Sequence, residues 1–254
     1  MSETNQANWD ALETAAARSI GARSDRTKER TLTSAHSDEH GPRWAWAHVA
    51  LGSAGILVVS LFYILSPAAA VLPALGADLA PARAAALTDA GFMRLAGATG
   101  VLSDLLAAAG ALGLAQAAAK KRGERQAVGF YWLACSALIF TLVDALVGFS
   151  LRASAAAGLA TFAVIKPLFD VLTAAGSFAY GAGSLLIAWP SPDGIAIGPR
   201  RLALAVIVLG ALLAVAGPAS VGGLGAGQLI GLGLTLQTVL LTVIAARNAL
   251  ASST

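Results

Sequence analysis

The chain has 254 residues, of which 57% are hydrophobic and only 12% are charged, with a formal net charge of +3. Soluble globular proteins carry about 25% charged residues, so this composition excludes an ordinary soluble domain and indicates a protein that crosses a membrane several times. The single cysteine, Cys135, excludes an intrachain disulfide. The bias toward Ala, Gly and Leu, and toward Arg over Lys, is typical of a bacterial source.

The first 42 residues form a polar segment that holds half of the acidic residues of the chain. Within it, NWDALETAAARSI has apolar residues at helical spacing and predicts a short amphipathic helix, and the rest of this tail is expected to be disordered. HSDEH, residues 36–40, matches the H-x-x-E-H pattern of some zinc proteases. That pattern needs a helix, and Gly41 and Pro42 follow at once, so we expect a polar segment here and no metal site.

Six apolar segments follow, and crossing the roughly 30 Å hydrocarbon core of a bilayer takes about 20 residues. They lie at residues 44–65, about 94–118, about 127–150, 168–189, 202–217 and about 221–246. The loop at 66–91 contains a short amphipathic helix bracketed by Asp78, Pro81 and Gly91. PASVGG, residues 218–223, predicts a tight turn.

The predicted fold is therefore all-α: a polytopic membrane protein with a bundle of six transmembrane helices. The transmembrane domain is expected to span residues 43–248, between the cytoplasmic tail, residues 1–42, and a short C-terminal tail, residues 249–254.

Lysine and arginine residues predict the orientation, because they are enriched on the cytoplasmic side of membrane proteins. With the N-terminus inside, thirteen of them fall on the inner side, and three, Arg83, Arg94 and Arg152, fall on the outer side. We therefore predict a multi-pass protein of a bacterial inner membrane, with both termini in the cytoplasm.

Aromatic residues near the predicted inner helix ends are typical of an interfacial belt. These tryptophans are Trp44, Trp46, Trp132 and Trp189. His48 lies beside two of them and is interpreted as an interfacial histidine, with axial ligation of a pigment as the alternative. Haem held by two histidines would need a second histidine inside the membrane, and none is present.

Charged residues inside the apolar segments are costly, at about 2.5–3.5 kcal/mol for an Asp at a helix centre, and they usually face the bundle interior and find partners. Asp104 is predicted near the membrane midplane. An outward-facing polar pocket is predicted from five residues: Asp104, Asp144, Lys166, Asp170 and Arg94. The structural alternative is that these residues only fix helix packing.

The segment VIKPLFD, residues 164–170, contains a lysine and an aspartate four residues apart. Pro167 fits the first turn of a helix, and the residue before a proline is pushed away from helical geometry. This predicts that Lys166 lies at or just outside the outer interface and that Asp170 lies in the first helical turn, in place of a buried ion pair.

The sixth segment carries glycines every four residues, which predicts a ridge that another helix approaches closely. The ridge consists of Gly223, Gly227 and Gly231, and packing inside the bundle is favoured over dimerisation. Gln228 and Gln237 are expected to form hydrogen bonds across a helix interface.

No phosphate-binding loop, nucleophile with a base, or cofactor motif is found, so catalysis is not favoured and no cofactor is expected. Basic residues of the tail alternate with acidic ones, which indicates contact with lipid and excludes nucleic acid as a partner. The leading hypothesis is a non-catalytic accessory, scaffold or assembly subunit that engages other membrane-protein subunits through its tail or its sixth helix. The alternative is a small transporter or channel-like protein, and an intramembrane enzyme or pigment carrier is a third option.

Two stretches, MRLAGATGVLSDLL at 93–106 and IGPRRLALAVIVLGALLAVAG at 197–217, carry a resemblance together with the layout of tail, six spans and long first outer loop. The chain resembles an uncharacterised bacterial six-helix membrane protein family, a domain of unknown function, over residues 44–247. Arg94 and Asp104 are the residues on which the likeness rests. The resemblance implies the topology and no activity.

Overall fold

The structure, a computed structural model, describes residues 41–65, 71, 78–88, 90–189, 195–221 and 227–251. Six of its helices are long and apolar enough to cross a membrane, which confirms the predicted all-α fold with six transmembrane helices. The chain divides into two units, residues 1–39 and 40–254, and these helices belong to the second unit. The helix predicted in the tail and the HSDEH motif lie outside the described residues.

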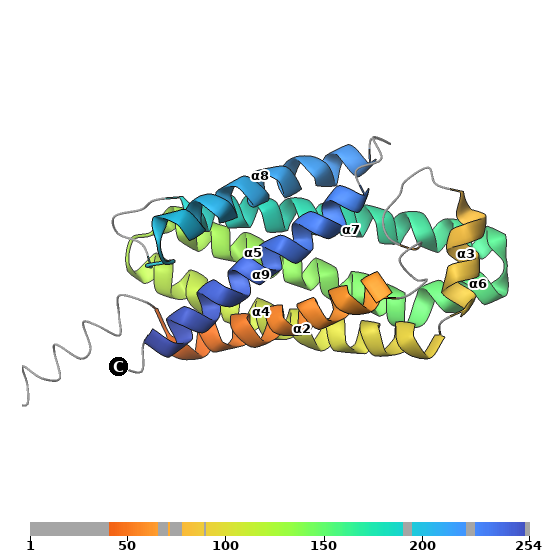
Figure 1. Ribbon diagram of the computed structural model, residues 1–254, viewed down its shortest axis with the longest axis horizontal. Helices are drawn as coiled ribbons and strands as arrows, with labels where there is room; N and C mark the ends of the chain where they lie inside the picture. Colours follow the sequence, from red (N-terminus) through yellow and green to blue (C-terminus); the bar gives the residue numbers. More distant parts are fainter. Residues whose placement is uncertain are drawn as a thin grey trace, which may run out of the picture. The chain divides into compact units, whose positions relative to one another are not determined.

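Figure 1 shows the helices of the second unit in chain order. They are α2 (Arg43–Leu65), α3 (Leu79–Thr88), α4 (Ala90–Lys120), α5 (Glu124–Ala145), the π-helical turn η2 (Leu146–Ser150), α6 (Leu151–Ala157), α7 (Leu159–Ala188), α8 (Arg200–Val221) and α9 (Gly227–Ala251). The third span is continuous through α5, η2 and α6. The short helix predicted in the first loop is α3, and the Asp78 carboxylate accepts a hydrogen bond from the backbone N–H of Ala80 at its start.

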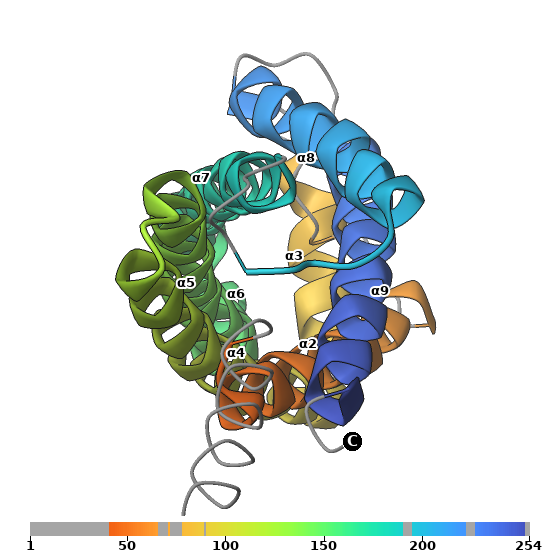
Figure 2. The ribbon, with the colours of Figure 1, turned by 90° about the vertical axis from the view of Figure 1, so that its left-hand side faces the viewer.

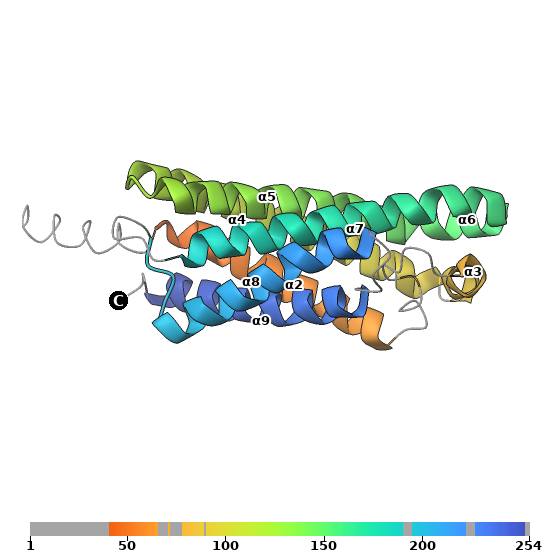
Figure 3. The same ribbon diagram turned by 90° about the horizontal axis from the view of Figure 1, so that it is seen from above.

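The six long helices form a closed ring. Each packs against two neighbours, in the order α2, α4, α5, α7, α8, α9 and back to α2, and Figure 2 looks along the axis of this ring. The short helix α3 packs against α6 and α7, and Figure 3 shows α3 and α6 at the same end of the bundle. α2 and α8 start at the opposite side of the bundle, and α4 and α9 finish there. Basic residues gather at that side, which is called the basic end below. They are Arg43, Lys120, Lys121, Arg122, Arg125, Arg200, Arg201 and Arg247.

Glycines allow the backbones of neighbouring helices in the ring to touch. A Cβ atom at Gly52 of α2 would lie 2.6 Å from the backbone nitrogen of Ala107 in α4. A Cβ atom at Gly97 of α4 would lie 2.5 Å from the Cα of Gly148 in the third span. A larger side chain at either position has no room, so these glycines set how closely α4 packs against both of its neighbours.

Of the glycine ridge predicted on the sixth helix, the structure describes the surroundings of Gly231 alone, and α9 does not approach a neighbour there. No atom lies within 4 Å of the place that a Cβ atom would take at Gly231, whereas a Cβ atom at Gly233 would lie 3.0 Å from the Leu213 side chain of α8. Gly223 and the surroundings of Gly227 lie outside what the structure describes. Successive helical residues point about 100° apart, and Gly231 is one residue away from the buried face of α9. That face carries Ile230, Gly233, Gln237, Leu241 and Ile244.

Two helix ends differ from the prediction because a proline lies inside a helix. α7 begins at Leu159 and contains Pro167, and α8 continues through Pro218 to Val221, so the predicted turn at 218–223 is wrong for residues 218–221. A proline inside a helix removes one backbone hydrogen bond, and membrane helices tolerate this where neighbours or side chains satisfy the freed group. The apolar residues before Pro167, which include the buried Phe162, favour continuation of the helix by packing into the core.

Trp46 does not belong to an interfacial belt. It is 2% exposed and its ring packs edge-on against Phe130, at 6.0 Å between centroids. Trp44 is 53% exposed, and Trp132 and Trp189 are also exposed, as the prediction for a belt requires. Trp44 and Trp46 lie two residues apart and therefore point to opposite sides of α2, and the sequence does not tell which of the two faces the core.

Candidate functional site

Two carboxyl groups from neighbouring helices meet inside the ring. Asp104 of α4 is 2% exposed and Asp144 of α5 is 8% exposed. The two carboxyl groups lie close enough to interact with each other directly. Two ionised carboxylates at such a place repel each other, and a proton on one of them removes the repulsion. The pair is therefore a place where the protein can hold a proton inside the membrane.

Glycines in α4 create the space for this pair. Gly100 lies one helical turn before Asp104, and a Cβ atom at Gly100 would overlap the Asp144 carboxyl group. The contact between Gly97 and Gly148 brings the two backbones together one turn further along. The turn η2 begins two residues after Asp144, and π-helical turns inside helices occur frequently at functional sites.

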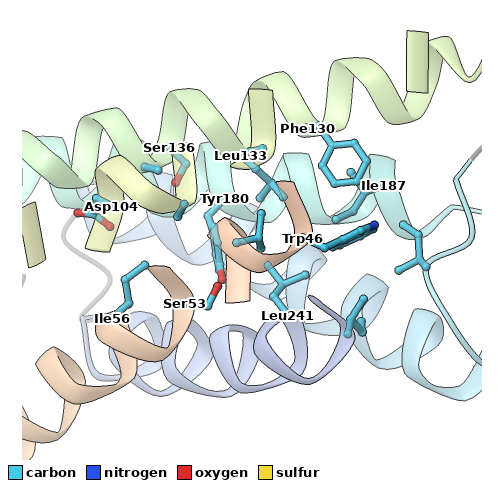
Figure 4. A pocket seen from close by; sticks show the side chains of 16 residues that line it. Trp46, Ser53, Ile56, Asp104, Phe130, Leu133, Ser136, Tyr180, Ile187 and Leu241 are labelled. Atoms are coloured by element: carbon cyan, nitrogen blue, oxygen red, sulfur yellow. The ribbon is translucent and has the colours of Figure 1, made fainter. Parts of the chain in front are cut away.

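Asp104 also lines a cavity inside the ring, with a volume of about 40 Å³. Its walls come from α2, α4, α5, α7 and α9 and are mostly apolar, with polar contributions from Ser53, Ser136 and Tyr180. Figure 4 shows Asp104 at one end of the row of lining side chains, with Trp46 and Ile187 toward the other end. A water molecule needs about 10–15 Å³ of such space, so the cavity accommodates two or three waters or one small cation.

One oxygen of Asp104, Oδ2, is buried and has no hydrogen-bond partner among the described residues. Buried polar atoms are rarely unsatisfied, and an exception needs a bound water, ion or proton to explain it. Two hydroxyl groups of the cavity wall are engaged elsewhere: Ser136 donates to the Gly176 carbonyl at 2.8 Å, and the hydroxyl of Tyr180 lies 3.1 Å from that of Thr238. The geometry therefore leaves Asp104 available to a small occupant of the cavity.

Lys166 and Asp170 form a second, separate pair on α7. The Lys166 Nζ donates to Asp170 Oδ1 at 2.5 Å, both side chains are 3% exposed, and the ammonium lies 5.6 Å from the centroid of the Phe169 ring. The prediction that Lys166 lies at an interface and that Asp170 lies in a first helical turn is wrong. Because α7 already begins at Leu159, both residues lie within the helix, four positions apart and on one face.

The five residues of the predicted pocket thus fall into three places. Asp104 pairs with Asp144, Lys166 pairs with Asp170, and Arg94 is exposed and makes no ion pair within the part of the chain that the structure describes. No described lysine or arginine forms an ion pair with Asp104 or Asp144. A basic residue of the described helices therefore does not neutralise either acid.

The position of the cavity relative to Asp104 also differs from the prediction. The cavity extends from Asp104 toward the basic end, where it is lined by Trp46, Ile187 and Ile197. On the other side of the pair, the interior is filled by a cluster of buried apolar residues that includes Met93, Val147 and Phe162. Among the described residues, the side of the pair on which the pocket is predicted carries this apolar cluster.

His48 is accounted for by its own helix. Its Nδ1 lies 2.8 Å from the Trp44 carbonyl oxygen, and the two rings pack edge to face. Among the described residues, no three His, Cys, Asp or Glu side chains are grouped as metal ligands would be. Neither observation tests the alternative of a bound pigment, which stays a hypothesis.

Of the two buried glutamines, sequence reasoning predicted Gln237 as a residue that bonds across a helix interface and missed Gln126. The Gln237 Nε2 donates to the Val206 carbonyl of α8 at 3.3 Å, as expected for a bond across a helix interface, and its Oε1 has no partner within the described residues. Gln126 of α5 is 3% exposed and forms three hydrogen bonds with residues near the basic end. The signal in the sequence is a glutamine next to an apolar run, which does not reveal its partners.

Comparisons with protein-family models, curated proteins and solved structures found no match. The resemblance to an uncharacterised six-helix family stays a prediction. The family of this chain is therefore not assigned, and its function is inferred from its own residues.

Proposed function

We propose that this protein is a small transporter or channel-like protein that moves protons or a small monovalent cation across a bilayer. The Asp104–Asp144 pair is the binding site of the moved ion in this proposal. The observation that carries it is the unpartnered, buried Oδ2 of Asp104 at the end of an interior cavity.

The cost of two acidic residues in this place supports the proposal. An ionisable residue inside a membrane is expensive and marks an ion or proton pathway by default. A pair that only fixed helix packing would be expected to satisfy all of its buried oxygens. A proton or a small cation would each compensate the negative charge of the two carboxyl groups, so both are candidate ions for this site.

The proposed orientation places the basic end in the cytoplasm of a bacterium, in its inner membrane, because basic residues are enriched on that side. The cavity then lies between the carboxyl pair and the cytoplasm. The accessory-subunit hypothesis rests largely on residues 1–42 and stays a prediction.

Ion flux into liposomes tests the proposal. The purified protein is reconstituted with an entrapped pH-sensitive dye, and proton uptake is driven by a membrane potential; a sodium gradient is tested in the same way. Flux of either ion is expected with the native chain. With Asp104→Asn it is expected to fall to the level of protein-free liposomes, because an amide does not exchange a proton and carries no charge for a cation.

Asp78→Asn is the matched control, because Asp78 is exposed at the start of α3 and an asparagine caps a helix equally well. Its flux is expected to equal that of the native chain. Flux that is unchanged by Asp104→Asn, or the absence of flux of both ions above protein-free liposomes, would refute the proposal.

A further inference from the structure

A short extended segment, residues 195–199, crosses the ring at the basic end and leads into α8. This segment, called the strap, is visible in Figure 2 as the stretch of chain that runs across the opening of the ring to the start of α8. Connections between helices usually run over the surface of a protein. The strap instead buries two isoleucines, Ile195 at 2% exposed and Ile197 at 8% exposed.

The strap closes the cavity at this end. Ile197 lines the cavity whose other end is Asp104. Ile195 packs into the core cluster that contains Trp46 and Ile187. Together these side chains lie between the interior of the ring and its basic end, so an ion that leaves the cavity on this side has to pass them.

Gln126 forms two hydrogen bonds with the strap and a third with Ile187 of α7. Its Nε2 donates to the Ile195 carbonyl at 3.1 Å and to the Ile187 carbonyl at 3.2 Å, and its Oε1 accepts from the Ile195 N–H at 2.6 Å. Asn248 of α9 adds a bond from its Nδ2 to the Ala196 carbonyl at 3.4 Å. The strap is thus tied to the third and sixth spans, which lie on different sides of the ring.

The attachment of the strap favours movement over a permanent seal. Gly198 has φ of +134°, a conformation that strongly favours glycine, so the chain turns at that point from the strap toward α8. Three side-chain hydrogen bonds hold the strap, and such bonds are individually weak because water replaces them when they open. An opening at this site therefore exchanges these bonds and exposes the two isoleucines, and it leaves the helices intact.

We infer that the strap is a gate at the basic end of the cavity and that Gln126 is the residue that latches it. What the gate controls rests on the proposed function, because the cavity is the proposed path of the ion. The position of the gate rests on the hydrogen bonds and on the buried isoleucines.

Access of a thiol reagent to the cavity tests the gate without any measurement of flux. Cys135, which is exposed, is first replaced by serine, and Ser53→Cys then places a thiol in the cavity wall. A charged, membrane-impermeant methanethiosulfonate is added from one side of the membrane at a time. Gln126→Ala is expected to raise the labelling rate of the new thiol by about tenfold or more, from the side of the basic end only.

The matched control is Gln116→Ala, which makes the same change at an exposed position of α4 and is expected to leave the rate unchanged. Ile197→Ala is a second test, because it shortens the plug and keeps the latch; it is also expected to speed labelling from that side. Unchanged labelling in Ile197→Ala and in a folded Gln126→Ala protein would overturn the gate. If labelling is faster but Asp104→Asn does not change the ion flux, the gate is supported and the proposed function is refuted.

Discussion

Replacing Lys166 by methionine removes one partner of a buried ion pair and leaves the other in place. Lys166 and Asp170 are each 3% exposed, and their charged groups are 2.5 Å apart. Methionine is close to lysine in length and keeps the contact with Phe169. The substitution therefore isolates the loss of the positive charge, and Asp170 becomes a buried acid without its cation.

Removing one partner of a buried pair costs about 3–5 kcal/mol in soluble proteins. We expect the lower end, about 3 kcal/mol, because both residues lie on α7 and a helix that persists in the unfolded state keeps part of their interaction. The double substitution Lys166→Met with Asp170→Leu removes both charges, and we expect it to lie within about 1 kcal/mol of the native chain. The two single costs are thus strongly non-additive.

Unfolding by titration with sodium dodecyl sulfate in mixed micelles measures these free energies. Lys120→Met is the control, because Lys120 is exposed at the end of α4 and its loss is expected to change stability by less than about 0.5 kcal/mol. A double variant that loses as much stability as the two single variants together would refute the reasoning, since it would mean that the charges do not compensate each other.

Two further predictions concern packing. A leucine in Gly97→Leu has to displace the Gly148 backbone, so we expect the melting midpoint of the protein in detergent to fall by roughly 3–10 °C. Gly231→Leu is the control, because no atom lies within 4 Å of the added Cβ atom and the midpoint is expected to stay the same. Equal shifts in the two variants would contradict the helix contacts. Trp46→Ala removes a core ring and should cost about 3–5 kcal/mol, while Trp44→Ala, at a 53% exposed ring, should cost far less in the same micelle titration. If Trp44→Ala lost more free energy of unfolding than Trp46→Ala, the assignment of Trp46 to the core would be wrong.

The sequence by itself determined the number and the type of the spanning elements. Six runs of apolar residues, each about as long as a bilayer is thick, are enough to predict six helices, because a backbone in lipid must satisfy its own hydrogen bonds. Local chemistry also determined α3, with Asp78 at its start. The ends of helices were less secure, since Pro167 and Pro218 are tolerated inside helices where tertiary contacts favour continuation.

The tertiary structure decided which side of each helix faces the interior. In a soluble protein the polar face of a helix reveals the buried one, but lipid is as apolar as the core, so both faces carry similar residues. Glycines at 97, 100 and 148 and the aspartates at 104 and 144 become one site only when α4 packs against the third span. The same packing separates Lys166 and Asp170 from that site and ties Gln126 to the strap. The position of a polar residue within an apolar segment predicts that it is buried, and the packing of the helices decides which residues it contacts.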